Sequence, residues 1–251
     1  MYPYAIIGDI DLYAIFLACG ICAALVVFRI ASDISKIGTK LFNFTLVLAL
    51  VSVTSGYFFS VFFQALFNIK SRGAFIIDSQ TGATFAGGAI GGAAVFILLY
   101  FIFGKKFDDN YKSSFAKIAD CAACAIPAGH SLGRVGCLMA GCCYGKETPS
   151  PFGIYMQSID RRVLPVQLYE AVFLAALAVI LMLSLKKEKN HQLCAYLFSY
   201  GIWRFFIEFL RDDYRGEILG GILSPSQFIS VLFVGSAALI YIIERKRDAE
   251  V

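Results

Sequence analysis

The sequence predicts an all-α membrane protein with seven transmembrane helices, its N-terminus external and its C-terminus cytoplasmic. Of its 251 residues, 59% are hydrophobic and 16% are charged, whereas soluble domains carry about 25% charged residues. Apolar runs of about 20 residues, the length that crosses a bilayer as a helix, recur along the chain. We therefore expect one integral-membrane domain over residues 1–251, and we attribute the net charge of +4 to loop lysines and arginines rather than to a nucleic-acid-binding surface.

The apolar runs place the seven spans at about 11–30, 42–68, 84–104, 115–133, 166–185, 193–210 and 223–243. The fourth span is the weakest, because it contains Asp120, Pro127, Gly129, His130 and Gly133. Interrupted segments at membrane depth are tolerated only where they face protein or a water-filled cavity. The fourth span is therefore predicted to line the interior of the protein.

The loops give the orientation. Lysine and arginine are enriched after the first, third, fifth and seventh spans, for example in "GKK" at 104–106 and "ERKR" at 244–247. Cytoplasmic loops carry such an excess. These loops are therefore predicted to be cytoplasmic, and residues 134–165 are predicted to form the largest external connection.

Ionisable residues within spans are costly unless they are paired or solvated, so each is a candidate functional residue. Three sites stand out: Arg134 at the end of the fourth span, Glu170 in the fifth, and Arg204, Glu208 and Arg211 in or at the end of the sixth. The last three are spaced i, i+4, i+7 and share one helix face.

These charges have two interpretations. The first is internal ion pairs between helices, with Arg134–Glu170 and Arg204–Glu208 as candidates. The second is an anionic ligand bound between the fourth, fifth and sixth helices near the outer leaflet. Arginine suits a phosphate, because its guanidinium stays charged and binds phosphate oxygens in a bidentate manner. Three arginines beside one or two carboxylates leave positive charge over, which favours the phosphate.

Several blocks then suggest a family. They are "DLYAIFLACG" with Tyr13, "SGYFFSVFF", "GATFAGGAIGG", "GRVG" at 133–136, "PVQLYEA" at 165–171, "YGIWRFFIEFLRDD" at 200–213 and "LSPSQFIS" at 223–230. In order and spacing they resemble the prolipoprotein diacylglyceryl transferase family, seven-span enzymes of the bacterial inner membrane. The resemblance covers nearly the whole chain.

The resemblance implies an enzyme without a cofactor. It would move the diacylglyceryl group of phosphatidylglycerol, or of another anionic phospholipid, onto the lipobox cysteine of a preprotein and release glycerol phosphate. Arg134 and Arg204 would bind the phosphate, and Glu208 would orient Arg204. The headgroup pocket would be lined by Tyr13, Gly133, Gln167, Tyr169, Glu170, Tyr200 and Arg211. The protein would be a multi-pass protein of the bacterial inner (cytoplasmic) membrane.

The chain departs from the family pattern at several positions. Ala86 stands where the family has a histidine widely regarded as catalytic, and Thr54 stands where the family has an arginine in the second span. Two asparagines and a glutamate of the family signature correspond to Cys137, Ala140 and Cys142. His130, four residues before Arg134, is either a substitute base that activates a thiol or a hydrogen-bonded histidine at a helix end.

The neighbouring thiols Cys137, Cys142 and Cys143 have three interpretations. They are packed or disulfide-bonded on the external face, or they form a metal site with His130, although C-x₄-C-C lacks the usual paired spacing. In the third, one thiol is a nucleophile that carries the lipid transiently. The competing function for the whole chain is a non-catalytic, anionic-phospholipid-binding membrane protein on the same scaffold.

Overall fold

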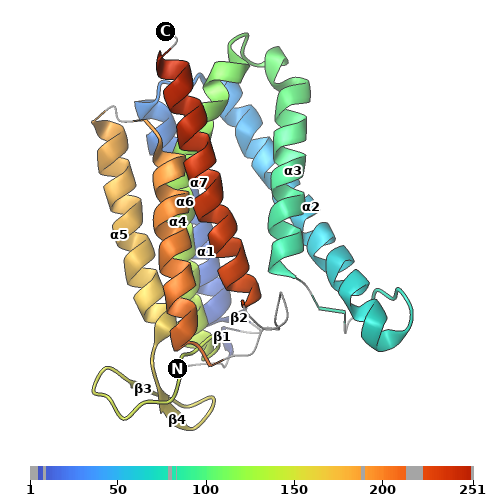
Figure 1. Cartoon of the computed structure of the whole chain (residues 1–251), viewed down its shortest axis with the longest axis vertical. Coiled ribbons are helices and arrows are strands. Elements are labelled where there is room, and N and C mark those ends of the chain that lie inside the picture. The colour runs from blue at the N-terminus through green and yellow to red at the C-terminus, as the bar shows by residue number, and fades with distance from the viewer. Residues whose placement is uncertain are drawn as a thin grey trace. The chain divides into compact units, whose positions relative to one another are not determined.

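The computed structural model describes residues 5–7, 10–78, 81–82, 84–187, 190–212 and 223–249. Over these residues the chain forms seven α-helices, two 3₁₀ helices and four short strands. The helices are α1 (Leu12–Ile34), α2 (Thr39–Arg72), α3 (Phe85–Phe103), η1 (Gly104–Lys106), α4 (Tyr111–Ala140), α5 (Val166–Lys186), α6 (Gln192–Ile207), η2 (Glu208–Leu210) and α7 (Pro225–Ala249). The strands pair as two antiparallel hairpins, β1 (Ala5–Ile7) with β2 (Ile10–Asp11) and β3 (Ile154–Met156) with β4 (Arg161–Val163) (Figure 1).

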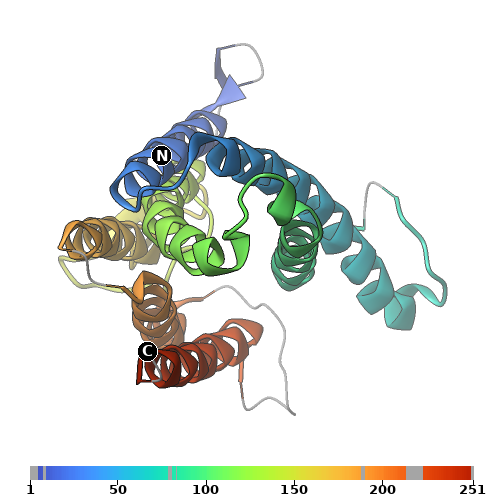
Figure 2. The same cartoon turned by 90° about the horizontal axis from the view of Figure 1, so that it is seen from above.

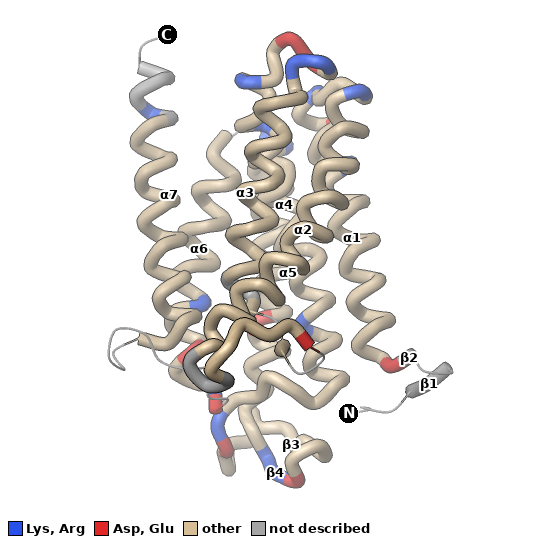
Figure 3. Tube along the Cα trace, turned by 90° about the vertical axis from the view of Figure 1, so that its right-hand side faces the viewer, with Lys and Arg blue, Asp and Glu red and all other residues tan. Residues whose placement is uncertain are grey.

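Most of the helices can cross a membrane. Of the seven in the described part of the chain, six are long and apolar enough to do so: α1, α2, α3, α5, α6 with η2, and α7. Charged residues gather at helix ends and in connections, while long stretches of the helices are uncharged (Figure 3). The seventh helix, α4, is not among these six, and it contains Pro127, His130 and Arg134. The chain is thus largely helical, as predicted, with a multi-pass composition.

The chain divides into two compact units, Met1–Ser35 with Ile118–Val251, and Lys36–Lys117. In the second unit α2 packs against α3 through glycines. A β-carbon at Gly56 would lie 2.9 Å from the carbonyl oxygen of Gly88, and one at Gly92 would lie 2.9 Å from that of Ser52. Small residues at such positions let two membrane helices approach closely.

The first unit contains α1, most of α4, and α5 to α7. Seen end-on, α4 lies among α1, α5 and α6 (Figure 2). Its crossing with α1 is close, because β-carbons at Gly20 and Gly129 would lie 2.7 Å and 2.8 Å from the carbonyl oxygen of the opposite glycine. The fourth span was predicted to line the interior of the protein. Cys124, Pro127 and Ser131 of α4 are buried, in agreement with that prediction.

Asp120, the acidic residue of the predicted fourth span, has a structural role. Its carboxylate accepts the backbone N–H of His191 at 3.2 Å and that of Leu193 at 2.8 Å. These are among the N–H groups that a helix leaves unsatisfied at its first turn. Asp120 therefore ties α4 to the start of α6.

The structure corrects the end of the fourth helix. Arg134 lies inside α4, which continues to Ala140, so the connection to α5 begins at Gly141 rather than at residue 134. Gly136 does not stop the helix, because it packs beside Tyr13, whose ring would lie 3.2 Å from an added β-carbon. The helix ends where Gly141 adopts a left-handed conformation, with φ of 71°, which costs glycine little.

The Gly20–Gly129 crossing can be tested by substitution. We expect Gly129→Val to lower the unfolding temperature in detergent by about 2–12 °C, because overpacking costs about 1–3 kcal/mol. Gly235→Val on α7 is the matched control, since nothing lies within 4 Å of a β-carbon there. Equal unfolding temperatures for the two variants would contradict the close crossing.

Candidate active site

The first polar group inside the bundle joins α4, α5 and α6. Arg134 donates from Nη2 to Oε1 of Glu170 at 3.0 Å, and its Nε lies 3.0 Å from Oε2. The hydroxyl of Tyr200 donates to the same Oε1 at 2.9 Å. Glu170 is only 1% exposed. A carboxylate so far from water is stable only when it is paired and hydrogen-bonded, and this one has both kinds of partner.

The second group lies at the end of α6. Arg204 Nη2 is 2.7 Å from Oε2 of Glu208 and donates to the hydroxyl of Ser226 at 2.8 Å. The other oxygen of Glu208 accepts from the hydroxyl of Ser224 at 3.0 Å. The Nε of Arg211 lies 3.9 Å from Glu208 Oε2. The i, i+4, i+7 set thus converges as predicted, although η2 replaces the last turn of the α-helix.

Both ion pairs that the sequence offered as candidates are present. Arg134 lies against Glu170, and Arg204 lies against Glu208, with Arg211 close to the same carboxylate. Among the residues that the structure describes, the buried atoms Arg204 Nη1 and Gln167 Oε1 have no hydrogen-bond partner. Buried polar groups without partners are costly, so the site is chemically suited to an anion with several acceptor oxygens and a hydroxyl group.

The other predicted site residues lie around these groups in different ways. The His130 ring is edge-on to that of Tyr200, with centroids 5.6 Å apart. Gly133 has open space where a β-carbon would be. The hydroxyl of Tyr169 instead donates to the carbonyl of Phe152 at 3.1 Å, in the connection after α4. Tyr13 lies within electrostatic range of the three thiols and of Arg134.

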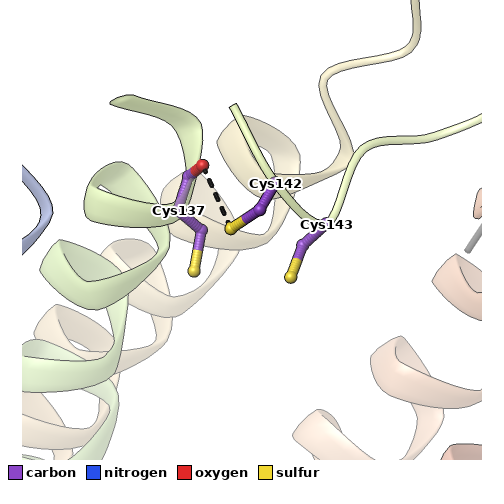
Figure 4. A group of neighbouring side chains, drawn as sticks. All are labelled: Cys137, Cys142 and Cys143. Carbon is purple, nitrogen blue, oxygen red and sulfur yellow. Dashed lines mark hydrogen bonds between the residues drawn. The ribbon is translucent and has the colours of Figure 1, made fainter. Parts of the chain in front are cut away.

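The three thiols come together at the end of α4 (Figure 4), where their sulfur atoms all lie within 4.8 Å of one another. The cause is the helix cap. The N–H of Gly141 bonds to the carbonyl of Leu138 at 3.2 Å, and the N–H of Cys142 bonds to that of Cys137 at 3.1 Å. This is the Schellman arrangement, which brings the second residue after the cap onto the helix residue five positions earlier. The C-x₄-C spacing is therefore a contact spacing when glycine precedes the second cysteine.

Hydrogen bonds fix the backbone of this turn. The buried Gln167 on α5 donates from Nε2 to the carbonyl of Cys142, and Ser158 donates to the carbonyl of Gly141 at 2.8 Å. Cys143 is held in a left-handed conformation, with φ of 60°, which is uncommon for a residue other than glycine. Below the turn, Leu138 packs with Met156 and Val163 of the β3–β4 hairpin.

Cys143 lies beside two thiols and a guanidinium. The pKa of its thiol is lowered, because the neighbouring thiols of Cys137 and Cys142 and the guanidinium of Arg211 stabilise its charged form. The thiol of Cys142 donates to the carbonyl of Cys137 at 3.6 Å. All eight cysteines are present as thiols.

Two of the departures lie in the other unit. Ala86 lies in the first turn of α3, and nothing is described of its side chain. Thr54 on α2 donates its hydroxyl to the carbonyl of Leu50 at 3.0 Å. That bond, four residues back along the same helix, satisfies the hydroxyl locally.

A bundle of apolar helices with paired guanidinium and carboxylate groups in its interior defines a multi-pass membrane protein built around a polar centre. The family model for prolipoprotein diacylglyceryl transferase matches residues 4–243. The chain therefore belongs to the prolipoprotein diacylglyceryl transferase family, which confirms the resemblance found in the sequence.

Individual relatives agree. The chain is 30% identical over 232 residues to phosphatidylglycerol–prolipoprotein diacylglyceryl transferase 2 of Clostridium perfringens, covering 90% of this chain and 87% of that protein. It is 33% identical over 187 residues to the phosphatidylglycerol–prolipoprotein diacylglyceryl transferase of Clostridium tetani, covering 72% and 71%. With the protein of the same name from Clostridioides difficile the identity is 28% over 245 residues, covering 96% and 94%.

The Arg134–Glu170 pair can be tested by a double-mutant cycle on thermal unfolding in detergent. Glu170→Leu should destabilise strongly, by about 3–5 kcal/mol, because it leaves a buried guanidinium without its counter-charge. The double variant Arg134→Met/Glu170→Leu should recover most of that loss, since apolar replacement of a whole buried pair is often neutral.

The control cycle uses Arg29 and Asp33, a pair on α1 with a 2.9 Å contact and side chains about half exposed, 49% and 57%. Exposed pairs contribute little, so this cycle should show almost no coupling. If the double variant at Arg134 and Glu170 instead lost the sum of the two single effects, the buried pair would be refuted.

Proposed function

We propose that this protein transfers the diacylglyceryl group of phosphatidylglycerol to a cysteine thiol of a lipoprotein precursor. Membership in the family and the printed names of its relatives support this activity. The buried guanidiniums of Arg134 and Arg204 support an anionic lipid as the donor. The observation on which the proposal depends is the buried Nη1 of Arg204, which has no hydrogen-bond partner among the described residues, because the reaction must stabilise a departing phosphate.

The reaction forms a carbon–sulfur bond and breaks the bond between the glyceryl carbon and a phosphate oxygen. The thiolate of the acceptor supplies the electron pair, and the leaving phosphate takes the pair of the broken bond. In this proposal Arg204 and Arg134 bind the phosphate oxygens. The buried Nη1 of Arg204 is the atom that would donate to the phosphate. Its Nη2 lies 2.7 Å from Glu208, which holds the guanidinium in place. Charge stabilisation by a preorganised donor is worth about 3–4 kcal/mol.

The remaining polar groups position the headgroup. Glu170 holds Arg134 in place and Tyr200 supports Glu170, since the Arg134 guanidinium and the Tyr200 hydroxyl both donate to Oε1 of Glu170. Arg211, Tyr13 and Gly133 belong to the surrounding pocket in this proposal, and Gly133 leaves room for the ligand. Gln167 and Tyr169 act by holding the connection after α4, through their bonds to the carbonyls of Cys142 and Phe152.

The acceptor thiol must lose its proton, and Ala86 offers no base for this step. Two features of the chain can account for it. One is His130, which the sequence allows either as a substitute base or as a hydrogen-bonded histidine at a helix end, and whose ring lies edge-on to that of Tyr200. The other is the cluster of thiols at the end of α4.

The proposal includes a membrane topology. With α4 as the fourth span, the chain has seven spans in the bacterial inner membrane, the N-terminus external and the C-terminus cytoplasmic. This topology is supported by the lysines and arginines of the loops. It puts the β3–β4 hairpin and the thiol cluster outside, on the side where a secreted precursor arrives.

The activity is tested with purified protein in detergent micelles containing phosphatidylglycerol and a lipobox peptide. We expect the peptide to gain the mass of a diacylglyceryl group on its cysteine, with release of glycerol phosphate. Phospholipid binding without either product would favour the non-catalytic lipid-binding alternative and refute the transferase.

Arg204→Lys tests the phosphate role, because lysine keeps the charge but loses the bidentate fork. We expect kcat to fall by about 100-fold or more, with the unfolding temperature almost unchanged. Arg29→Lys, at an exposed position of α1, is the matched control and should keep full activity. A fully active Arg204→Lys variant would remove Arg204 from the mechanism.

A further inference from the structure

The three thiols at the end of α4 are more than the family's chemistry requires. We propose that Cys137, Cys142 and Cys143 bind a thiophilic divalent cation of the Zn²⁺ class, whose fourth coordination position takes the acceptor thiol. This inference rests on the transferase activity proposed above, and it names how the acceptor is held and activated.

The geometry fits a three-thiolate site. Zinc binds sulfur at about 2.3 Å, which separates two sulfurs of a tetrahedral site by about 3.8 Å. The three sulfurs here already lie within 4.8 Å of one another, so small rotations of the side chains bring them to that distance. A single disulfide would use two of the thiols and leave the third. A metal ion uses all three.

The backbone holds the ligands in place. The Schellman turn fixes Cys142 over Cys137 by the bond of 3.1 Å between its N–H and the carbonyl of Cys137. Gln167 fixes the other side of the Cys142 peptide unit. The left-handed conformation of Cys143, with φ of 60°, turns its side chain to the same place. Such outer contacts orient metal ligands and commonly contribute about 10–100-fold to affinity.

The surrounding charges suit the complex. Three thiolates and one divalent cation carry one net negative charge, and a fourth thiolate adds another. Arg211 lies beside Cys143, and Arg134 lies within electrostatic range of Cys137 and Cys143. The guanidinium of Arg211 offsets the charge of the three-thiolate complex, so Arg134 remains for Glu170 and the phosphate. Arg134 also belongs to the pair beside which the phosphate is proposed to bind, so an acceptor on the metal would lie near the donor lipid.

The fourth coordination position of the metal explains how the acceptor thiol loses its proton. Three protein ligands plus an exchangeable fourth position are typical of catalytic zinc, whereas structural zinc uses four protein ligands. In the described residues the cluster has three ligands. A coordinated thiol is deprotonated outright, so the metal performs the step for which Ala86 supplies no base.

The balance of the step is simple. The acceptor thiol replaces a water on the metal and releases its proton to the solvent. The sulfur electron pair then forms the bond to the glyceryl carbon, and the carbon–oxygen bond to phosphate breaks toward the oxygen. The thioether is a weaker ligand than the thiolate, so it leaves and water returns. Nothing is oxidised or reduced.

Metal binding is measured on the full-length protein by elemental analysis after dialysis against Zn²⁺. We expect about one Zn²⁺ per chain in the wild type, and loss of it in Cys137→Ser and Cys143→Ser. Cys22→Ser on α1, where the thiol is exposed, is the matched control and should keep the metal. A wild-type protein without Zn²⁺, or with a disulfide between two of the three cysteines, would overturn the proposal.

The open position is tested with Co²⁺ in place of Zn²⁺. Addition of the lipobox peptide should shift the visible absorption bands of the Co²⁺, because a thiolate replaces water. The same peptide with serine for cysteine should leave the spectrum unchanged. No shift with the cysteine peptide would mean a structural metal and would refute the acceptor site.

Activity separates this proposal from the transferase itself and needs no variant. Wild-type protein stripped by a chelator should lose at least 100-fold in thioether formation and regain it with Zn²⁺. Full activity of the stripped protein would refute the metal role and leave the transferase intact. Absence of product in the Zn²⁺-loaded protein would refute the transferase, while the binding and spectral results would still decide the metal site.

Discussion

The buried ion pair between Arg134 and Glu170 is the constraint on which the first unit depends. A carboxylate that is 1% exposed cannot stay charged without a partner, so α4 and α5 must meet where these residues lie. Tyr200 brings α6 to the same oxygen at 2.9 Å. The glycine crossing at Gly20 and Gly129 lets α1 approach α4 closely enough to close the unit on the other side.

The polar interior and the thiol cluster are positioned by the same two helices, α4 and α5. Arg134 and Cys137 lie on the same helix, and Gln167 and Glu170 lie close together on α5. α4 and α5 therefore position the anion-binding charges and, through the bond from Gln167 to the Cys142 carbonyl, the turn that carries the cysteines. This chain keeps the arginines that would bind the phosphate. It carries thiols in place of polar residues of the family signature, so the groups that would activate the acceptor are different.

Much of this could be predicted from the sequence, because hydropathy and the cost of buried charge act locally. The helices lie close to the predicted spans, and both candidate ion pairs exist. The end of α4 could not be predicted from its glycines, since Gly133 and Gly136 lie within the helix and only Gly141 adopts the left-handed conformation that ends it. The hairpins were missed because strands of two or three residues carry almost no periodic signal.

The cysteine contact was missed for a different reason. The spacings that indicate a zinc site in a sequence are paired motifs such as C-x₂₋₄-C, whereas the contact here comes from a helix cap with glycine between the two cysteines. The partners of Gln167 and Tyr169 depend on the path of the connection after α4, which tertiary packing sets and no local pattern encodes.

The central claim is that the buried guanidiniums of Arg204 and Arg134 bind the phosphate of the donor lipid. The most direct measurement is an experimental structure of the protein with phosphatidylglycerol bound. The account predicts the phosphate within hydrogen-bond distance of Arg204, with the glyceryl carbon directed toward the thiol cluster. A phosphate bound elsewhere, with both ion pairs unchanged and no lipid beside them, would contradict it.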